Sequence, residues 1–174
     1  MVKNILLDLD QTLIFSNELA KFKPSAKMKL FKYRQMDNSY ITFERPHLQE
    51  FLDYIFKNFR VAVWTAASKE YAKFIIDNFI LIKPGRKLDF VFYSYHCNLS
   101  TTSGNGLKGL NMLWEKFKLK GYNKSNTIII DDNHDVKKIQ IDNCYHINEF
   151  NYNKKDSEND KELLELMHIL KKVT

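Results

Sequence analysis

The amino-acid sequence predicts an α/β fold in which helices flank a central parallel sheet. Continuously apolar runs, typical of strands that are buried on both faces, occur within residues 4–10, 60–65 and 127–131. Segments with the apolar spacing of helices separate these runs. Because the crossovers between such strands are right-handed, the carboxyl ends of the strands should meet at one edge of the sheet.

A β-hairpin is predicted after the first strand. Strand-like residues at 27–34 and 39–44 flank the turn signal Met36-Asp37-Asn38. We therefore expect a small hairpin insert that spans residues 27–44.

The rest of the chain alternates helices and strands. Pro46 suits the first turn of a helix, and Ser68 suits the N-cap of a second helix that reaches about Asn78. The polar stretch 148–160 is the best candidate for a mobile segment. The other predicted elements are strands at 60–65, 90–93, 127–131 and 144–147, and helices at 110–117 and 161–173.

The length of 174 residues fits one domain over residues 1–174. The composition is globular, with 44% apolar and 28% charged residues, and no apolar run approaches the roughly 20 residues of a membrane span. We therefore expect no membrane partner. Two cysteines, Cys97 and Cys144, are too few for a disulfide scaffold and should be buried. They favour a reducing, intracellular location, nuclear or cytoplasmic, or within a host cell if the source is a virus.

The formal net charge of +6 permits an acidic partner such as nucleic acid. Arginine occurs only at positions 34, 45, 60 and 86, and the lysines look spread along the chain rather than clustered. This pattern argues against a dedicated nucleic-acid surface. The oligomeric state is not predicted.

Polar side chains follow four predicted strands and should gather at one edge of the sheet. So many acids stay ionised together only beside a compensating charge. Mg²⁺ supplies that charge and recruits phosphate oxygens, for which a hydroxyl and an ammonium group are suitable ligands. The pattern therefore suggests Mg²⁺-assisted phosphoryl transfer, with a carboxylate as a possible nucleophile. The residues are Asp8, Asp10 and Thr12, then Thr65, then Lys108, then Asp131 and Asp132.

The segment Asp8-Leu-Asp-Gln-Thr12 resembles the DxDxT signature of the haloacid dehalogenase (HAD) phosphatases, and the other three HAD motifs follow in order. More narrowly, the chain resembles the FCP/SCP group, which are phosphatases of the RNA polymerase II C-terminal domain. The segments that carry this resemblance are 8–13, 45–52, 64–71, 106–108 and 129–132.

The resemblance implies a HAD-like Rossmannoid fold and an aspartyl-phosphate intermediate, with Mg²⁺ as the cofactor. Asp8 would be the nucleophile and a metal ligand. Asp10 would protonate the leaving oxygen and then deprotonate water, while its main-chain carbonyl binds the metal. Thr12 would orient the loop between Asp8 and Asp10.

The resemblance also assigns the phosphate and metal ligands on the other strands. Thr65, Ala66 and Lys108 would bind the phosphate. Asp132 would complete the metal site, with Asp131 as a second ligand or a support, and the two are not ranked.

The predicted elements largely fill the intervals from Thr12 to Thr65 and from Thr65 to Lys108. No large cap domain fits in them, so the site should be open to solvent. An open site admits a phosphate that is displayed on a polymer. We therefore expect a phosphorylated protein or peptide as the partner, with phosphoserine or phosphothreonine as the group hydrolysed.

In the family that this chain resembles, the insert forms part of an apolar pocket for a proline near the phosphoserine. Aromatic residues of the predicted hairpin could build such a pocket, or could only seal the hairpin onto the domain. Two departures from the family pattern weaken the expectation that this chain shares the polymerase repeat as substrate. Gln11 replaces the usual acidic residue, and the segment 92–95 lacks the arginine that small CTD phosphatases place there. The aromatic residues are Phe31, Tyr33, Tyr40 and Phe43.

Two other functions stay open. The same motifs and the net charge permit a 3′-phosphatase of DNA or RNA ends, for which binding should depend steeply on salt. A non-catalytic scaffold with the same fold is the second, although intact Asp8 and Asp10 argue against it. His134, just after the acidic pair, is expected on the surface rather than as a metal ligand.

Overall fold

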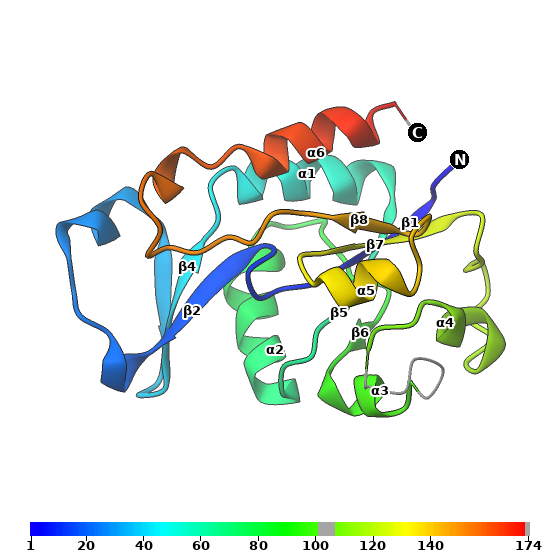
Figure 1. Ribbon diagram of the computed structural model, residues 1–174, viewed down its shortest axis with the longest axis horizontal. Coiled ribbons are helices and arrows are strands. Elements are labelled where there is room, and N and C mark those ends of the chain that lie inside the picture. The colour runs from blue at the N-terminus through cyan, green and yellow to red at the C-terminus, as the bar shows by residue number, and fades with distance from the viewer. Residues whose placement is uncertain (101–106, 173–174) are drawn as a thin grey trace.

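The computed structural model describes residues 1–100 and 107–172. A five-stranded sheet in the order β6-β5-β1-β7-β8 forms its centre (Figure 1). All four strand pairs are parallel, so the carboxyl ends of the strands share one edge of the sheet. This arrangement confirms the predicted α/β fold class. The strands are β1 (Asn4–Leu7), β5 (Arg60–Trp64), β6 (Val91–Phe92), β7 (Thr127–Asp131) and β8 (Cys144–His146).

Helices cover both faces of this sheet and enclose two apolar cores. On β1, Ile5 and Leu7 face one core and Leu6 faces the other, because successive side chains of a strand point to opposite faces. Helices α1 (Leu48–Asn58), α2 (Lys69–Ile75) and α6 (Glu162–Leu170) pack on the first face, where α6 lies beside α1 (Figure 1). Helices α3 (Ser94–Asn98), α4 (Asn111–Glu115) and α5 (His134–Lys138) cover the second.

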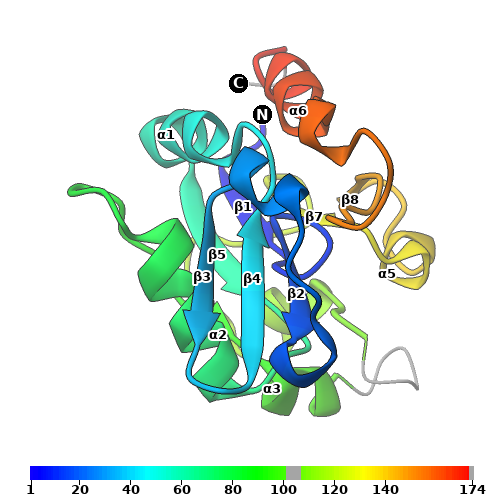
Figure 2. The same ribbon diagram turned by 90° about the vertical axis from the view of Figure 1, so that its left-hand side faces the viewer.

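The insert after β1 is an antiparallel sheet in the order β2-β4-β3 (Figure 2). The two-stranded hairpin predicted over 27–44 is therefore incomplete, because β2 adds a third strand. The strand predicted at 27–34 begins only at Tyr33, since Met28 packs against the core of the insert from a 3₁₀ helix. The elements are β2 (Ile14–Glu18), the 3₁₀ helices η1 (Leu19–Lys21) and η2 (Ala26–Leu30), β3 (Tyr33–Met36) and β4 (Tyr40–Glu44).

Helix α2 begins as predicted but ends early. The Ser68 hydroxyl accepts a hydrogen bond from the Tyr71 N–H at 3.2 Å and caps the helix. The chain then continues as a π-helical turn, η3 (Ile76–Ile80), in which the Leu81 N–H donates to the Ile76 carbonyl at 2.8 Å. The short helices α3 and α5 were not predicted, because their mostly polar sequences lack the apolar spacing of a helix.

The stretch predicted to be mobile, 148–160, instead packs against the insert. Phe150 and Tyr152 are buried, and the Tyr152 ring stacks on Phe43 with ring centroids 3.8 Å apart. The segment ends in the 3₁₀ helix η4 (Ser157–Asn159). Its aromatic residues hold the segment against the insert, although the mostly polar composition does not indicate this packing.

Arg45 is fully buried and joins this segment to the loop after β1. Its Nε and Nη2 atoms donate to the two carboxylate oxygens of Asp160, each at 2.9 Å. Nη1 donates to the Thr12 carbonyl and Nη2 to the Asn148 carbonyl, also at 2.9 Å. The guanidinium therefore restrains the main chain at Thr12 by its hydrogen bond to the carbonyl.

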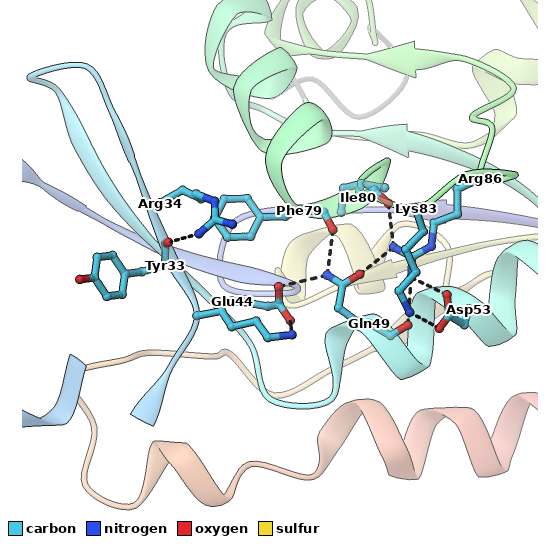
Figure 3. Close-up of polar contacts among 10 residues, drawn as sticks. Tyr33, Arg34, Glu44, Gln49, Asp53, Phe79, Ile80, Lys83 and Arg86 are labelled. Atoms are coloured by element: carbon cyan, nitrogen blue, oxygen red, sulfur yellow. Dashed lines mark hydrogen bonds and ion pairs between the residues drawn. The ribbon is translucent and has the colours of Figure 1, made fainter. Parts of the chain in front are cut away.

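A second polar network braces the insert against α1 (Figure 3). The amide nitrogen of Gln49 donates to the buried Glu44 carboxylate and to the Phe79 carbonyl, both at 3.0 Å. The Gln49 amide oxygen accepts from Arg86 at 2.8 Å, and Arg86 also pairs with Asp53 at 2.6 Å. Burial raises the pKa of Glu44, and the hydrogen bond from Gln49 partly offsets this shift.

Candidate active site

A cavity of about 280 Å³ opens at the carboxyl edge of the parallel sheet. Asp8 follows β1, Thr65 and Ala66 follow β5, and Asp131 and Asp132 lie at the end of β7. The cavity therefore brings together residues that the sequence separates by more than half the chain. Its lining also includes Asp10, Gln11, Ala67, Cys97, Leu107, Lys108, Asn133 and Val136.

Lys108 lies between two of the carboxylates. Its ammonium group contacts Asp8 and donates to Asp131 at 2.8 Å, and all three side chains are nearly buried. Burial alone would lower the pKa of Lys108, but the charges of Asp8 and Asp131 raise it above its ordinary value. Lys108 is therefore a fixed cation that faces the cavity, suited to an anionic ligand.

Three carboxylates form a candidate metal site. Asp8, Asp131 and Asp132 each offer an oxygen, and these oxygens lie within 4.8 Å of one another. Burial, together with the charge of Asp8, raises the pKa of Asp131 to about 7 and also raises the pKa of Asp132. A hard divalent cation would offset this repulsion, and all the donors are the oxygens that Mg²⁺ prefers. The residues present thus fit a bound Mg²⁺.

Asp10 points to a different partner. Its carboxylate accepts a hydrogen bond from the phenol of Tyr71 on α2. Burial raises the pKa of Asp10 to about 6, against the hydrogen bond from Tyr71, which lowers it. A carboxyl group with this pKa can hold and release a proton near neutral pH, as an acid-base group must.

The Tyr71 phenol links Asp10 to the insert. The Ser16 hydroxyl on β2 lies 2.5 Å from the Tyr71 oxygen and 2.7 Å from the Thr42 hydroxyl on β4. Burial, and then the charge of Asp10, raise the pKa of Tyr71. The phenol therefore keeps its proton and orients the Asp10 carboxylate by donating a hydrogen bond to it.

Thr12 holds the loop after β1 against the acidic pair. Its hydroxyl donates to the Asp132 carboxylate at 3.0 Å and accepts from the Asp132 N–H at 3.2 Å. The turn needs a left-handed residue at Gln11, where φ is 62°. Thr12 does not line the cavity, so it positions Asp132 and the loop rather than touching a ligand.

The main chain at Lys108 is held by Gln140, just after α5. The Gln140 amide nitrogen donates to the Lys108 carbonyl at 2.8 Å, and its oxygen accepts from the Leu110 N–H at 2.9 Å. The Asn133 N–H at the start of α5 donates to Asp131 at 2.8 Å. The segment from Asn133 to Gln140 thus joins the acidic pair to the lysine.

Sequence reasoning missed the roles of Tyr71 and Gln140. Tyr71 lies among the apolar residues of the helix that follows Ser68, a position typical of the core, although a phenol on a buried stripe is a sign of a polar partner. Gln140 follows a mostly polar helix that the apolar spacing does not predict, and nothing in the local pattern distinguishes it.

The insert aromatics divide into two pairs. Phe43 is fully buried, and Phe31 packs edge-on against it with centroids 6.3 Å apart, so these two seal the insert. Tyr33 is 41% exposed, and Tyr40 packs edge-on against Tyr71 at 5.3 Å. None of the four lines the cavity, so a role for them in substrate binding stays a prediction.

His134 is exposed, as expected, and its ring lies 5.4 Å from that of His146. Cys97 and Cys144 are both buried and free, as expected.

Comparison with known proteins decides the family. The model of the NLI interacting factor-like phosphatases matches residues 3–174. This chain belongs to that family. The chain is similar to the putative CTD phosphatase-like proteins 355R of Invertebrate iridescent virus 6, at 45% identity, and of Invertebrate iridescent virus 3, at 42%. Each alignment covers 97% of this chain, and 97% and 95% of the respective viral proteins.

Solved structures support the family fold. The RNA polymerase II CTD phosphatase Fcp1 matches with a TM-score of 0.61 at 19% identity, over 97% of this chain and 49% of that one. A fission yeast Fcp1-R271A chain bound to beryllium fluoride matches at 0.58 and 18%, over 97% of this chain and 51% of that one. A predicted HAD-like hydrolase from Porphyromonas gingivalis matches at 0.55 and 15%, over 98% of each chain.

The family and the fold make this chain a phosphatase of the HAD type. The chain spans about half the length of the Fcp1 chains but nearly all of the viral relatives. Across the part of the chain that the structure describes, every helix is too short or too polar to span a bilayer.

Proposed function

We propose that this chain is a Mg²⁺-dependent phosphatase that hydrolyses phosphoserine or phosphothreonine in proteins through a phosphoryl group on Asp8. The observation that carries the proposal is the contact of Lys108 with Asp8 inside a cavity that Asp10, Asp131 and Asp132 also line. A nucleophile, an acid-base group, a phosphate-binding cation and a metal site are thereby within one small space.

In the first step, an Asp8 carboxylate oxygen attacks phosphorus and the bond from phosphorus to the serine oxygen breaks. Asp10 gives its proton to that leaving oxygen, so the products are the free hydroxyl and an aspartyl-phosphate. Lys108 holds the phosphoryl oxygens together with Thr65 and the main chain at Ala66. A bound Mg²⁺, held by Asp8, Asp131, Asp132 and the Asp10 carbonyl, would neutralise phosphate charge.

In the second step, ionised Asp10 takes a proton from water as the water oxygen attacks phosphorus. The bond from phosphorus to Asp8 breaks, which releases inorganic phosphate and restores both carboxyl groups. The hydrogen bond from Tyr71 to Asp10 keeps the carboxyl aimed at the same side of the cavity through both steps.

A protein substrate is supported by the names of the viral relatives, which describe CTD phosphatase-like proteins. The shallow cavity of about 280 Å³ also suits a phosphate presented on a chain rather than an enclosed metabolite. We extend the proposal to an intracellular enzyme of an infected cell, as the viral sources of these relatives suggest.

The test is hydrolysis of p-nitrophenyl phosphate, of a phosphoserine peptide and of a 3′-phosphorylated oligonucleotide, each with and without Mg²⁺. The wild type and Asp142→Asn, an exposed carboxylate outside the cavity, should turn over only with Mg²⁺. Asp8→Asn should be inactive while folding normally. Turnover by Asp8→Asn would refute the mechanism, and preference for a 3′-phosphorylated oligonucleotide would replace the substrate class.

A further inference from the structure

One segment of the insert, residues 20–36, is rich in positive charge. Residues 20–36 hold six of the 27 Lys and Arg residues and no Asp or Glu. The other 21 cations are therefore matched by the 21 acidic residues of the chain. Six cations therefore do cluster in this segment, contrary to the expectation that they are spread along the chain, although the acidic residues Glu18, Asp37 and Glu44 flank it within the insert.

Three of these cations lie along one border of the insert. Lys29 is in η2, Lys32 precedes β3, Arg34 is on β3, and all three are exposed. Lys32 lies 4.0 Å from Glu44, at the limit of an ion pair, and Arg34 donates to the Tyr33 carbonyl. Within residues 1–100 and 107–172, no acidic group pairs with Lys29 or Arg34. Their charges are therefore available to a ligand.

The same border is an open sheet edge. In the order β2-β4-β3, strand β3 is outermost, and in the described residues it pairs with β4 alone (Figure 2). An edge strand presents main-chain groups to which an extended peptide can add. Leu30 and Tyr33, which are 62% and 41% exposed, add apolar surface between the cations. We call Lys29, Lys32 and Arg34 with strand β3 the basic edge.

The basic edge lies within reach of a substrate in the phosphate cavity. Gln11 lines that cavity and β2 begins at Ile14. Two strand spacings of about 4.8 Å separate β2 from β3. An extended peptide advances about 3.3 Å per residue, so the basic edge would meet residues a short distance from the phosphorylated one.

We propose that the basic edge binds an acidic, extended segment of the phosphoprotein substrate, outside the phosphate that is hydrolysed. The proposal rests on the proposed phosphatase function and narrows its substrates to phosphopeptides whose neighbouring residues carry carboxylates or further phosphates. A peptide fits better than a nucleic acid, because the edge offers the main-chain hydrogen-bonding pattern of a missing strand beside the cations.

The experiment compares two phosphoserine peptides that differ only in whether the flanking residues are neutral or acidic. The variant Lys29→Gln/Arg34→Gln is tested against Lys3→Gln/Lys120→Gln. The control pair is also exposed and lies at the amino end of the sheet, where the Asn4 amide donates to the Gly121 carbonyl. All four side chains are on the surface, so both variants should fold. For each peptide, kcat/KM is measured at low and at high salt. The reference substrate is p-nitrophenyl phosphate, which has no flanking residues.

The wild type should prefer the acidic peptide, and salt should weaken that preference. One exposed charge pair changes an equilibrium by a factor of about 1.5 to 5, so the insert variant should lose about five-fold on the acidic peptide. It should keep the wild-type rate on the neutral peptide and on p-nitrophenyl phosphate, and the control should lose nothing. Equal preference in wild type and insert variant would overturn the proposal. In a parallel binding measurement with a single-stranded oligonucleotide, weaker binding by the insert variant with unchanged rates on both peptides would also overturn it. A wild type without p-nitrophenyl phosphate turnover would instead overturn the proposed function.

Discussion

Replacing Gln140 with leucine should impair the site without touching any ligand. The leucine side chain has a similar size but cannot donate to the Lys108 carbonyl or accept from the Leu110 N–H. Lys108 then loses the restraint on its main chain, while its own ammonium group is unchanged. Gln140 is a positioning residue in this account, and its effect should pass entirely through Lys108.

The magnitude follows from the two hydrogen bonds. Each contributes about 1 kcal/mol net, so Gln140→Leu should lower the free energy of unfolding by about 2 kcal/mol. If about 1.4 kcal/mol of that restraint is also lost in the transition state, kcat/KM falls about ten-fold. Most of the loss should appear in kcat, because only the restrained lysine meets the charge of the transferring phosphoryl group.

The assay is p-nitrophenyl phosphate hydrolysis in a double-mutant cycle with Lys108→Gln. Gln49→Leu is the matched control, since Gln49 is half-buried and bridges by its amide in the same way, but in the network of Figure 3. Gln49→Leu should cost similar stability and leave kcat/KM near the wild-type value. In the Lys108→Gln background, Gln140→Leu should not lower kcat/KM any further. The reasoning would be refuted if the double variant lost kcat/KM by the product of the two single losses. An equal loss of kcat/KM in Gln49→Leu would also refute it.

Four further predictions follow from named contacts. Tyr71→Phe should lower kcat about ten-fold or more while KM changes little, because a hydrogen bond to the charged Asp10 is lost; unchanged kcat would remove Tyr71 from the site. Arg45→Leu leaves Asp160 unpaired and should cost about 3–5 kcal/mol in urea unfolding, and a loss under 1 kcal/mol would contradict the clamp. The pKa of Glu44 is raised above 4.5 in the fold, so the stability linked to its protonated form is present below that pH and is lost as pH rises through the folded pKa. The free energy of unfolding of Glu44→Gln in urea, relative to that of the wild type, should therefore be higher at about pH 7 than at about pH 4. The same relative stability at both pH values would contradict the burial of Glu44. Mg²⁺ should raise the Tm of the wild type and not that of Asp132→Asn, and an equal rise in both would place the metal elsewhere.

Periodicity and turn chemistry were enough to predict the order of the main strands and helices. The apolar runs at β1, β5 and β7 are long enough to read, and their parallel pairing brings Asp8, Thr65 and Asp131 to one edge. The insert was predicted less well. Its first strand, β2, alternates weakly, and the residues before β3 turn as a 3₁₀ helix because Met28 and Phe31 pack inward against Phe43.

The supporting contacts of the site depend on tertiary structure that no local pattern encodes. Gln140 reaches Lys108 only because α5 and the segment after it fold back beside the loop that carries the lysine. Ser16 reaches Tyr71 across 55 residues because the insert sheet packs beside α2. The clustering of positive charge in residues 20–36 was visible in the sequence, but its position on an open sheet edge was not.

The central claim is that Asp8 receives the phosphoryl group. The most direct test mixes the Asp10→Asn variant and Mg²⁺ with p-nitrophenyl phosphate, whose good leaving group needs no acid but whose aspartyl ester still needs a base for hydrolysis. We expect a burst of one p-nitrophenolate per protein, followed by slow turnover, with the phosphoryl group found on Asp8 by mass spectrometry of the quenched protein. Steady release without a burst and without phosphorylated Asp8, or a phosphoryl group on another residue, would contradict it.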